Sequence, residues 1–112
     1  MTAVLRTSGA FEQRWSGDDG RTWGPPVTLE EGSVDADLTM MSHGVLACSY
    51  GRPGSNLMFS INGGKDWIHH RVITAESGFN YTSVQEIRPG RLLYVHDAPK
   101  LRALYVDVER VP

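Results

Sequence analysis

Two short stretches of the chain share one layout of side chains that could bind a cation or stabilise a turn. The first is SGDDGRTW, residues 16–23, and the second is SINGGKDW, residues 60–67. Both fit the pattern S-x-[DN]-x-G-x-[TD]-W. Asp18 and Asp19 are carboxylates of the kind that bind calcium, but the D-x-[DN]-x-[DN]-G order of a calcium loop is missing. The sequence therefore predicts no metal site and no cofactor.

The shared layout is also that of a turn stabilised by its own side chains, which we call a box turn. The Asp or Asn side chain can accept hydrogen bonds from backbone N–H groups of the turn, and a hydroxyl can close the loop. The glycine can take the positive φ of a tight reversal, and the tryptophan can cap an apolar layer. We assign this structural role to Ser16, Asp18, Gly20, Thr22 and Trp23 in the first box turn and to Ser60, Asn62, Gly64, Asp66 and Trp67 in the second.

Other reactive side chains have simpler interpretations. His69 and His70 are adjacent, so on a strand they face opposite sides and cannot chelate one metal as a pair. His43 is expected in a turn. Cys48 is the single cysteine, so no internal disulfide is possible, and its apolar neighbours favour a small core residue.

The composition describes a globular chain without a marked charge. Its 112 residues suit one ordinary domain, with 40% hydrophobic and 21% charged residues. A net charge of −2 gives no reason to expect nucleic acid or an anionic membrane as a partner. No apolar run could span a bilayer, and the opening MTAVLRTSG lacks the apolar stretch of a signal peptide. Strand-like residues start directly in this opening, so we expect the chain to be part of a longer protein.

Two markers repeat with nearly the same period. The box turns begin 44 residues apart, and the turn glycines Gly44 and Gly90 lie 46 residues apart. Such a period is typical of a four-stranded propeller blade of roughly 40–50 residues. The segments between turns are rich in β-branched, aromatic and leucine residues, and no convincing amphipathic helix is present. The sequence therefore predicts an all-β chain.

The expected strands divide unevenly over three blade remnants, at about residues 1–31, 32–76 and 77–112. If a blade's strands are lettered A to D from the axis outward, the first remnant supplies B to D. The second supplies all four, and the third supplies A to C. The prediction is about two and a half to three four-stranded antiparallel blades.

At this point the chain resembles the sialidase (neuraminidase) superfamily, whose six-bladed propeller carries such turns as Asp boxes. The family shows an arginine before an Asp box, a Tyr-Ser-x-Leu segment, a Gly turn and an LLYE-like strand. This chain has Arg52, the box at Ser60, YTSV from Tyr81, Gly90 and LLYV, and the likeness covers nearly all of residues 45–108. The resemblance implies a partial six-bladed β-propeller, with this chain as the C-terminal part of a longer parent protein.

The resemblance also implies a site for a terminal sialic acid, or a related acidic sugar, on a glycan. The family binds the sugar carboxylate with three arginines, because a guanidinium offers a planar bidentate fork. Arg52 matches one of them, and Arg6 matches an earlier one less closely. Tyr81 stands at the place of the nucleophilic tyrosine. Its neutral phenol avoids the repulsion that a carboxylate nucleophile would meet from the substrate.

The resemblance leaves essential groups outside this chain. A phenol with an ordinary pKa near ~10 needs a neighbouring base. The family's base, its acid and one arginine belong to earlier blades. Asp35 is a candidate substitute for the base at the substrate site. It lies nine residues before its turn glycine, as Tyr81 lies nine residues before Gly90. Val95 replaces the glutamate of the LLYE strand. We therefore expect the isolated chain to be inactive.

Three interpretations follow. The first is a portion of a sialidase-like glycoside hydrolase. The second is a non-catalytic Asp-box propeller that binds glycans or proteins, with Arg52 and Arg6 as surface cations and Tyr81 as an ordinary aromatic. The third is self-association, in which two copies close one ring and remove sheet edges that would invite aggregation. The compartment stays open, although family members are often secreted or at the cell surface.

Overall fold

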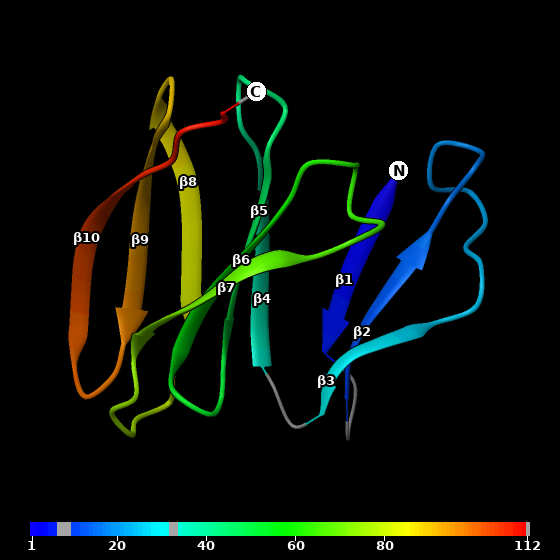
Figure 1. Ribbon diagram of the computed structural model, residues 1–112. Helices are drawn as coiled ribbons and strands as arrows, with labels where there is room; N and C mark the ends of the chain where they lie inside the picture. The colour runs from blue at the N-terminus through cyan, green and yellow to red at the C-terminus, as the bar shows by residue number, and fades with distance from the viewer. Residues whose placement is uncertain (7–9, 32–33, 112) are drawn as a thin grey trace.

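The described part of the chain consists of β-strands and turns, which confirms the all-β prediction (Figure 1). The computed structural model describes residues 1–6, 10–31 and 34–111. Within these ranges there is no helix that could cross a membrane.

Ten strands form three antiparallel sheets, each in chain order. The first sheet has the order β1-β2-β3, with bounds Thr2–Arg6, Ala10–Trp15 and Val27–Glu31. The second has the order β4-β5-β6-β7, with bounds Val34–Met40, Leu46–Gly51, Ser55–Ser60 and Ile68–Thr74. The third has the order β8-β9-β10, with bounds Thr82–Arg88, Arg91–Asp97 and Leu101–Asp107.

The number of strands in each sheet follows the prediction of three, four and three. Within the segment SVDADLTMM, residues Val34–Met40 form strand β4. The three sheets stand side by side with the second in the middle (Figure 1). The described residues close no ring, so the propeller stays a prediction.

Both faces of the middle sheet are covered. All six residues of β5 are buried, because the first sheet packs on one face and the third on the other. Toward the first sheet, the Phe11 and Tyr50 rings stack with centroids 5.4 Å apart. Toward the third sheet, the buried Tyr94 hydroxyl donates a 2.9 Å hydrogen bond to the Asn56 carbonyl. Burying these large side chains on both faces is the main source of stability in such a layered core.

The second and third sheets are joined by carboxylates rather than by a backbone ladder. Strands β4 and β8 lie next to each other but belong to different sheets. Asp37 accepts a 2.9 Å hydrogen bond from the Val84 N–H and a 3.0 Å bond from the Ser83 hydroxyl. An edge strand carries unpaired N–H groups, and these side-chain acceptors satisfy them. The two sheets are thereby held in one fixed register.

Candidate functional site

The first box turn is closed by hydrogen bonds among its own residues. The Ser16 hydroxyl oxygen accepts the Gly20 N–H at 2.8 Å, and Asp18 Oδ1 accepts the Thr22 N–H at 2.8 Å. Gly20 has a φ of 85°, as expected for the tight reversal. The Thr22 hydroxyl also donates to the carboxylate, and these bonds lower the pKa of Asp18 to about 2. The turn is stabilised by an ionised Asp18.

The second box turn reaches the same geometry with different donors. The buried Ser60 hydroxyl oxygen accepts the Gly64 N–H at 2.8 Å, and Asn62 Oδ1 accepts the Asp66 N–H at 2.9 Å. Asn62 Nδ2 donates to Asp66 Oδ2 at 2.7 Å, where in the first turn a threonine donates to an aspartate. In the first turn Thr22 is the donor and Asp18 the acceptor, whereas in the second Asn62 is the donor and Asp66 the acceptor. The two positions therefore change together.

The two tryptophans of the box turns make different contacts. The Trp67 ring packs on the cluster between the first two sheets, and its Nε1 donates to Gln13 Oε1 at 3.0 Å. Gln13 in turn donates to the Gly64 carbonyl at 2.9 Å, so the second box turn is bound to strand β2. Trp23 is 38% exposed and donates to the Gly20 carbonyl of its own turn. The expectation of an apolar cap is thus met by Trp67 and not by Trp23.

Arg52 and Tyr81 lie together at the junction of the second and third sheets. Arg52 directly follows β5, and Tyr81 directly precedes β8. The guanidinium carbon of Arg52 lies 5.6 Å from the centroid of the Tyr81 ring, within the range of a cation–π contact. Arg52 Nε also donates to the Phe79 carbonyl at 3.1 Å. The cation is therefore fixed to the segment that carries the phenol.

A tight backbone contact holds this arrangement. A Cβ added to Gly51 would lie 1.7 Å from the Asn80 carbonyl oxygen, so only glycine fits. Asn80 is buried with a φ of 58°, a backbone conformation that asparagine tolerates better than most residues. Its Oδ1 accepts a 3.1 Å hydrogen bond from the Ser55 hydroxyl. These contacts lock the segment before Arg52 against the segment before Tyr81.

Asp35 joins the same site from strand β4. A shallow pocket of about 210 Å³ is lined by Asp35, Tyr81 and Asp97 among others. Asp35 Oδ2 accepts the Thr82 N–H at 2.9 Å, which extends the carboxylate joint between β4 and β8. Asp97 Oδ1 accepts the Tyr81 N–H at 2.8 Å. One oxygen of each carboxylate thus orients the start of β8, next to Tyr81.

Three of the four candidate residues from the sequence therefore meet: Arg52 and Tyr81 in contact, and Asp35 in the pocket beside them. Arg6 ends strand β1, and its side chain lies outside the part of the chain that the structure describes. Val95 also lines the pocket.

Sequence reasoning missed Phe79. Its ring is 65% exposed and stacks on Tyr81 with centroids 5.9 Å apart and an interplanar angle of 23°. Asn80 between the two rings has a φ of 58°, so the segment is not a regular strand and strand alternation gave no signal for this stacking. The site consequently offers a cation, two neighbouring aromatic rings and two carboxylates.

The Arg52 guanidinium and the two rings can bind an anion whose body is a ring or a sugar, whereas one oxygen of Asp35 and one of Asp97 are taken up by backbone N–H groups. A guanidinium binds a carboxylate through charge-assisted hydrogen bonds, and exposed aromatic faces are suited to apolar faces of a ligand. Among the described residues, no side chain accepts a hydrogen bond from the Tyr81 hydroxyl, so no base is in place there. The described residues also bring no three metal-ligating side chains together.

Comparison with family models, with curated proteins and with solved structures finds no match to this chain.

Proposed function

We propose that the three sheets are successive blades of a sialidase-like β-propeller, and that Arg52 and Tyr81 belong to a site for a terminal acidic sugar. The observation that carries this proposal is the 5.6 Å contact between the Arg52 guanidinium carbon and the Tyr81 ring. The two residues adjoin strands of different sheets and are 29 positions apart, so their proximity is a property of the fold. The sialidase resemblance requires the same pair of residue types to be close.

In this proposal Arg52 binds the sugar carboxylate and Tyr81 is the nucleophile of a longer parent protein. The Tyr81 oxygen forms a bond to the anomeric carbon while the bond to the aglycone oxygen breaks. A base takes the phenol proton, and an acid gives a proton to the leaving oxygen. Water then cleaves the tyrosyl–sugar bond, and its proton returns to Tyr81. The base and the acid come from other blades of the parent, so the isolated chain is inactive.

A non-catalytic Asp-box propeller that binds glycans or proteins is the second candidate function. Two observations favour it: the Tyr81 hydroxyl has no acceptor among the described residues, and Asp35 already bonds the Thr82 N–H. An activated phenol needs a base within hydrogen-bond reach. A binding function needs only the cation and the aromatic rings.

A fluorogenic sialoside assay separates the two functions. This chain alone is expected to give no turnover. The chain joined to its upstream blades is expected to turn the sialoside over, and Tyr81→Phe is expected to reduce that turnover by more than about a hundredfold, the scale of a lost catalytic group. Phe retains the ring beside Arg52, so the loss reports the hydroxyl. No turnover, or turnover that Tyr81→Phe leaves unchanged, would reject the catalytic proposal and favour the binding one.

A further inference from the structure

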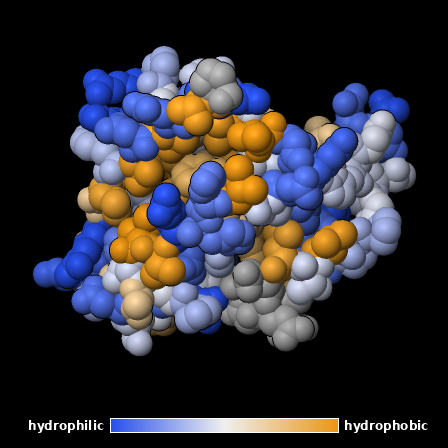
Figure 2. Space-filling view, viewed as in Figure 1, coloured by the Kyte–Doolittle hydropathy of each residue, from blue (hydrophilic) through white to orange (hydrophobic). Residues whose placement is uncertain are grey.

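A second hollow lies away from the Arg52–Tyr81 site. This groove of about 410 Å³ lies between strand β7 and the segment that follows β10, and it shares no lining residue with the pocket at Tyr81. Figure 2 shows hydrophobic side chains gathered around it. Its apolar lining includes Leu57, Phe59, Ile61, Ile68, Ile73 and Val108. The volume falls within the roughly 300–1,000 Å³ of small-molecule sites, which are also mostly apolar.

A bulge in strand β7 directs polar side chains into this groove. Leu57 pairs with Arg71 and Phe59 with Ile68, so β7 has one residue more than β6 between these pairs. His69 lies in the bulge with a φ of 52°. A side chain at positive φ costs of order 1–3 kcal/mol, and such bulges often re-aim a side chain next to a functional site. The neighbouring His70 faces the other side, where its ring lies 3.4 Å from the Tyr50 hydroxyl.

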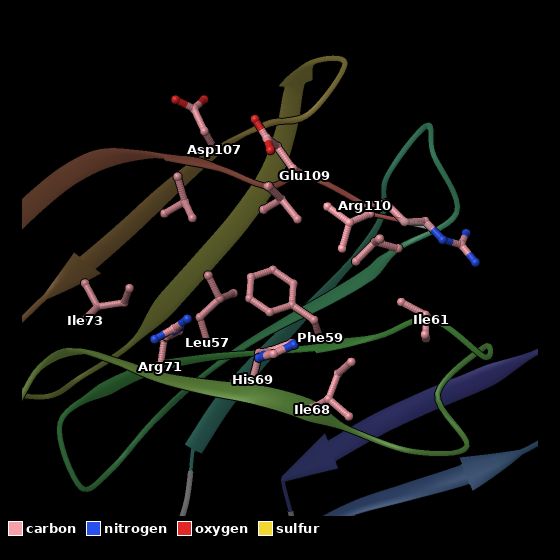
Figure 3. A pocket seen from close by; sticks show the side chains of 14 residues that line it. Leu57, Phe59, Ile61, Ile68, His69, Arg71, Ile73, Asp107, Glu109 and Arg110 are labelled. Atoms are coloured by element: carbon pink, nitrogen blue, oxygen red, sulfur yellow. The ribbon is translucent and has the colours of Figure 1, made fainter.

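The groove is basic on the β7 side. Figure 3 shows the His69 ring and the Arg71 guanidinium rising from β7 beside Leu57 and Phe59. Within the described chain Arg71 has no hydrogen bond and no ion pair. An arginine without a partner at the rim of an apolar groove is a site for an anion, because a carboxylate matches its planar fork.

The acidic residues around the groove do not neutralise this cation. Asp107 and Glu109 carry their carboxylates away from Arg71 (Figure 3). Asp107 is already paired, with Arg91 Nε at 2.7 Å from its Oδ1. Arg110 also lines the groove, but its Nη1 donates to the His43 carbonyl at 2.8 Å. The groove thus combines an apolar floor with Arg71 as the cation on its β7 side.

We propose that this groove binds an amphiphilic monocarboxylate, with its carboxylate on Arg71 and its apolar body along Phe59 and Ile73. The apolar contacts supply the main attraction, and Arg71 fixes the orientation of the ligand. This site is independent of the proposed acidic-sugar site.

The test uses octanoate as the probe and octanol as its uncharged match, titrated into the whole chain by calorimetry. Octanoate is expected to bind at least about tenfold more tightly than octanol, the scale of a charge-assisted hydrogen-bond pair. Arg71→Gln is expected to reduce octanoate binding to the level of octanol. Arg21→Gln, which changes an exposed arginine of the first box turn, is expected to leave binding unchanged. Ile61→Gln, at an exposed apolar position of the groove, is expected to weaken both ligands.

Several outcomes would overturn the proposal. These are octanoate that does not bind, octanoate and octanol that bind equally, and an Arg71→Gln variant that binds octanoate as the natural chain does. Self-association of the chain that excludes octanoate would also overturn it and would assign the groove to a second copy. Urea unfolding of each variant checks that the fold is intact, since Arg71 and Ile61 are exposed and their substitution is expected to leave the midpoint nearly unchanged.

Discussion

The guanidinium carbon of Arg52 lies 5.6 Å from the centre of the Tyr81 ring, although Arg52 follows a strand of the second sheet and Tyr81 precedes a strand of the third. The contact therefore depends on how the two sheets are joined. Asp35 and Asp37 bond the edge of β8, and Gly51 fits tightly against Asn80. The distance between the two side chains therefore stays fixed only while the two sheets keep their relative position.

Gly51→Ala is expected to destabilise the chain and to separate Arg52 from Tyr81. The new Cβ would lie 1.7 Å from the Asn80 carbonyl oxygen, and backbone cannot yield as a flexible side chain can. Overpacking of this kind costs about 1–3 kcal/mol or more. The free energy of unfolding, from urea titration, measures the effect.

Gly17→Ala is the matched control for that substitution. No atom lies within 4 Å of a Cβ added there, so a change within about 0.5 kcal/mol is expected. An equal effect of the two substitutions would contradict the account of a tight junction at Gly51.

Ser60→Ala is expected to destabilise the second box turn by about 1–3 kcal/mol, because it leaves buried donors unsatisfied. The Ser60 oxygen accepts N–H groups from Asn62 and Gly64 in a fully buried position. Thermal or urea unfolding measures the loss. Ser77→Ala, at an exposed position, serves as the control, and a loss no larger than in that control would show that the hydroxyl is dispensable.

Acid is expected to weaken the first box turn through Asp18. Its folded-state pKa of about 2 lies below the ordinary 3.8, so the ionised carboxylate adds stability above pH 3.8. That contribution is lost as the pH falls from 3.8 toward 2. The melting temperature, followed between pH 6 and about pH 2, should fall more in the natural chain than in Asp18→Asn.

Asn is a fair replacement for Asp18 because Asn62 occupies the same position in the second box turn. Asp18→Asn should therefore fold at neutral pH while removing the titration. Parallel acid curves for both proteins would show that the Asp18 carboxylate does not contribute to the pH dependence.

The Cys48 thiol is expected to resist modification in the folded chain. Its side chain is fully buried, and burial raises the pKa of the thiol well above its ordinary value. A thiol that is neither exposed nor ionised reacts with a disulfide reagent only when the chain opens. The rate should rise steeply across the urea transition, and rapid reaction in buffer would contradict the burial.

The strands could be predicted from the sequence because they depend on local patterns. The 44-residue spacing of the box turns and the β-rich segments between them gave all ten strands and their division among three sheets. The self-bonding of the box turns depends on residues at most four positions apart, as in Ser16 and Gly20. Such short-range geometry is encoded in residue type and spacing.

The contacts between sheets could not be predicted in the same way. The fit of Gly51 against Asn80 and the stacking of Phe79 on Tyr81 depend on packing over distance. The equivalence of Trp23 and Trp67 also fails in three dimensions, because only the second box turn has a neighbouring sheet at Gln13 among the described residues. The residue pair Arg52 and Tyr81 came from the family resemblance, not from spacing.

In the proposed function, Arg52 and Tyr81 form a site for an acidic sugar. The most direct test is calorimetric titration of this chain with N-acetylneuraminic acid and with its methyl ester, which has no charge. We expect the acid to bind at least about tenfold more tightly than the ester and Arg52→Gln to abolish the difference, since charge-assisted bonds to the carboxylate are lost. Equal binding of acid and ester, or a preference for the acid that survives in Arg52→Gln, would contradict it.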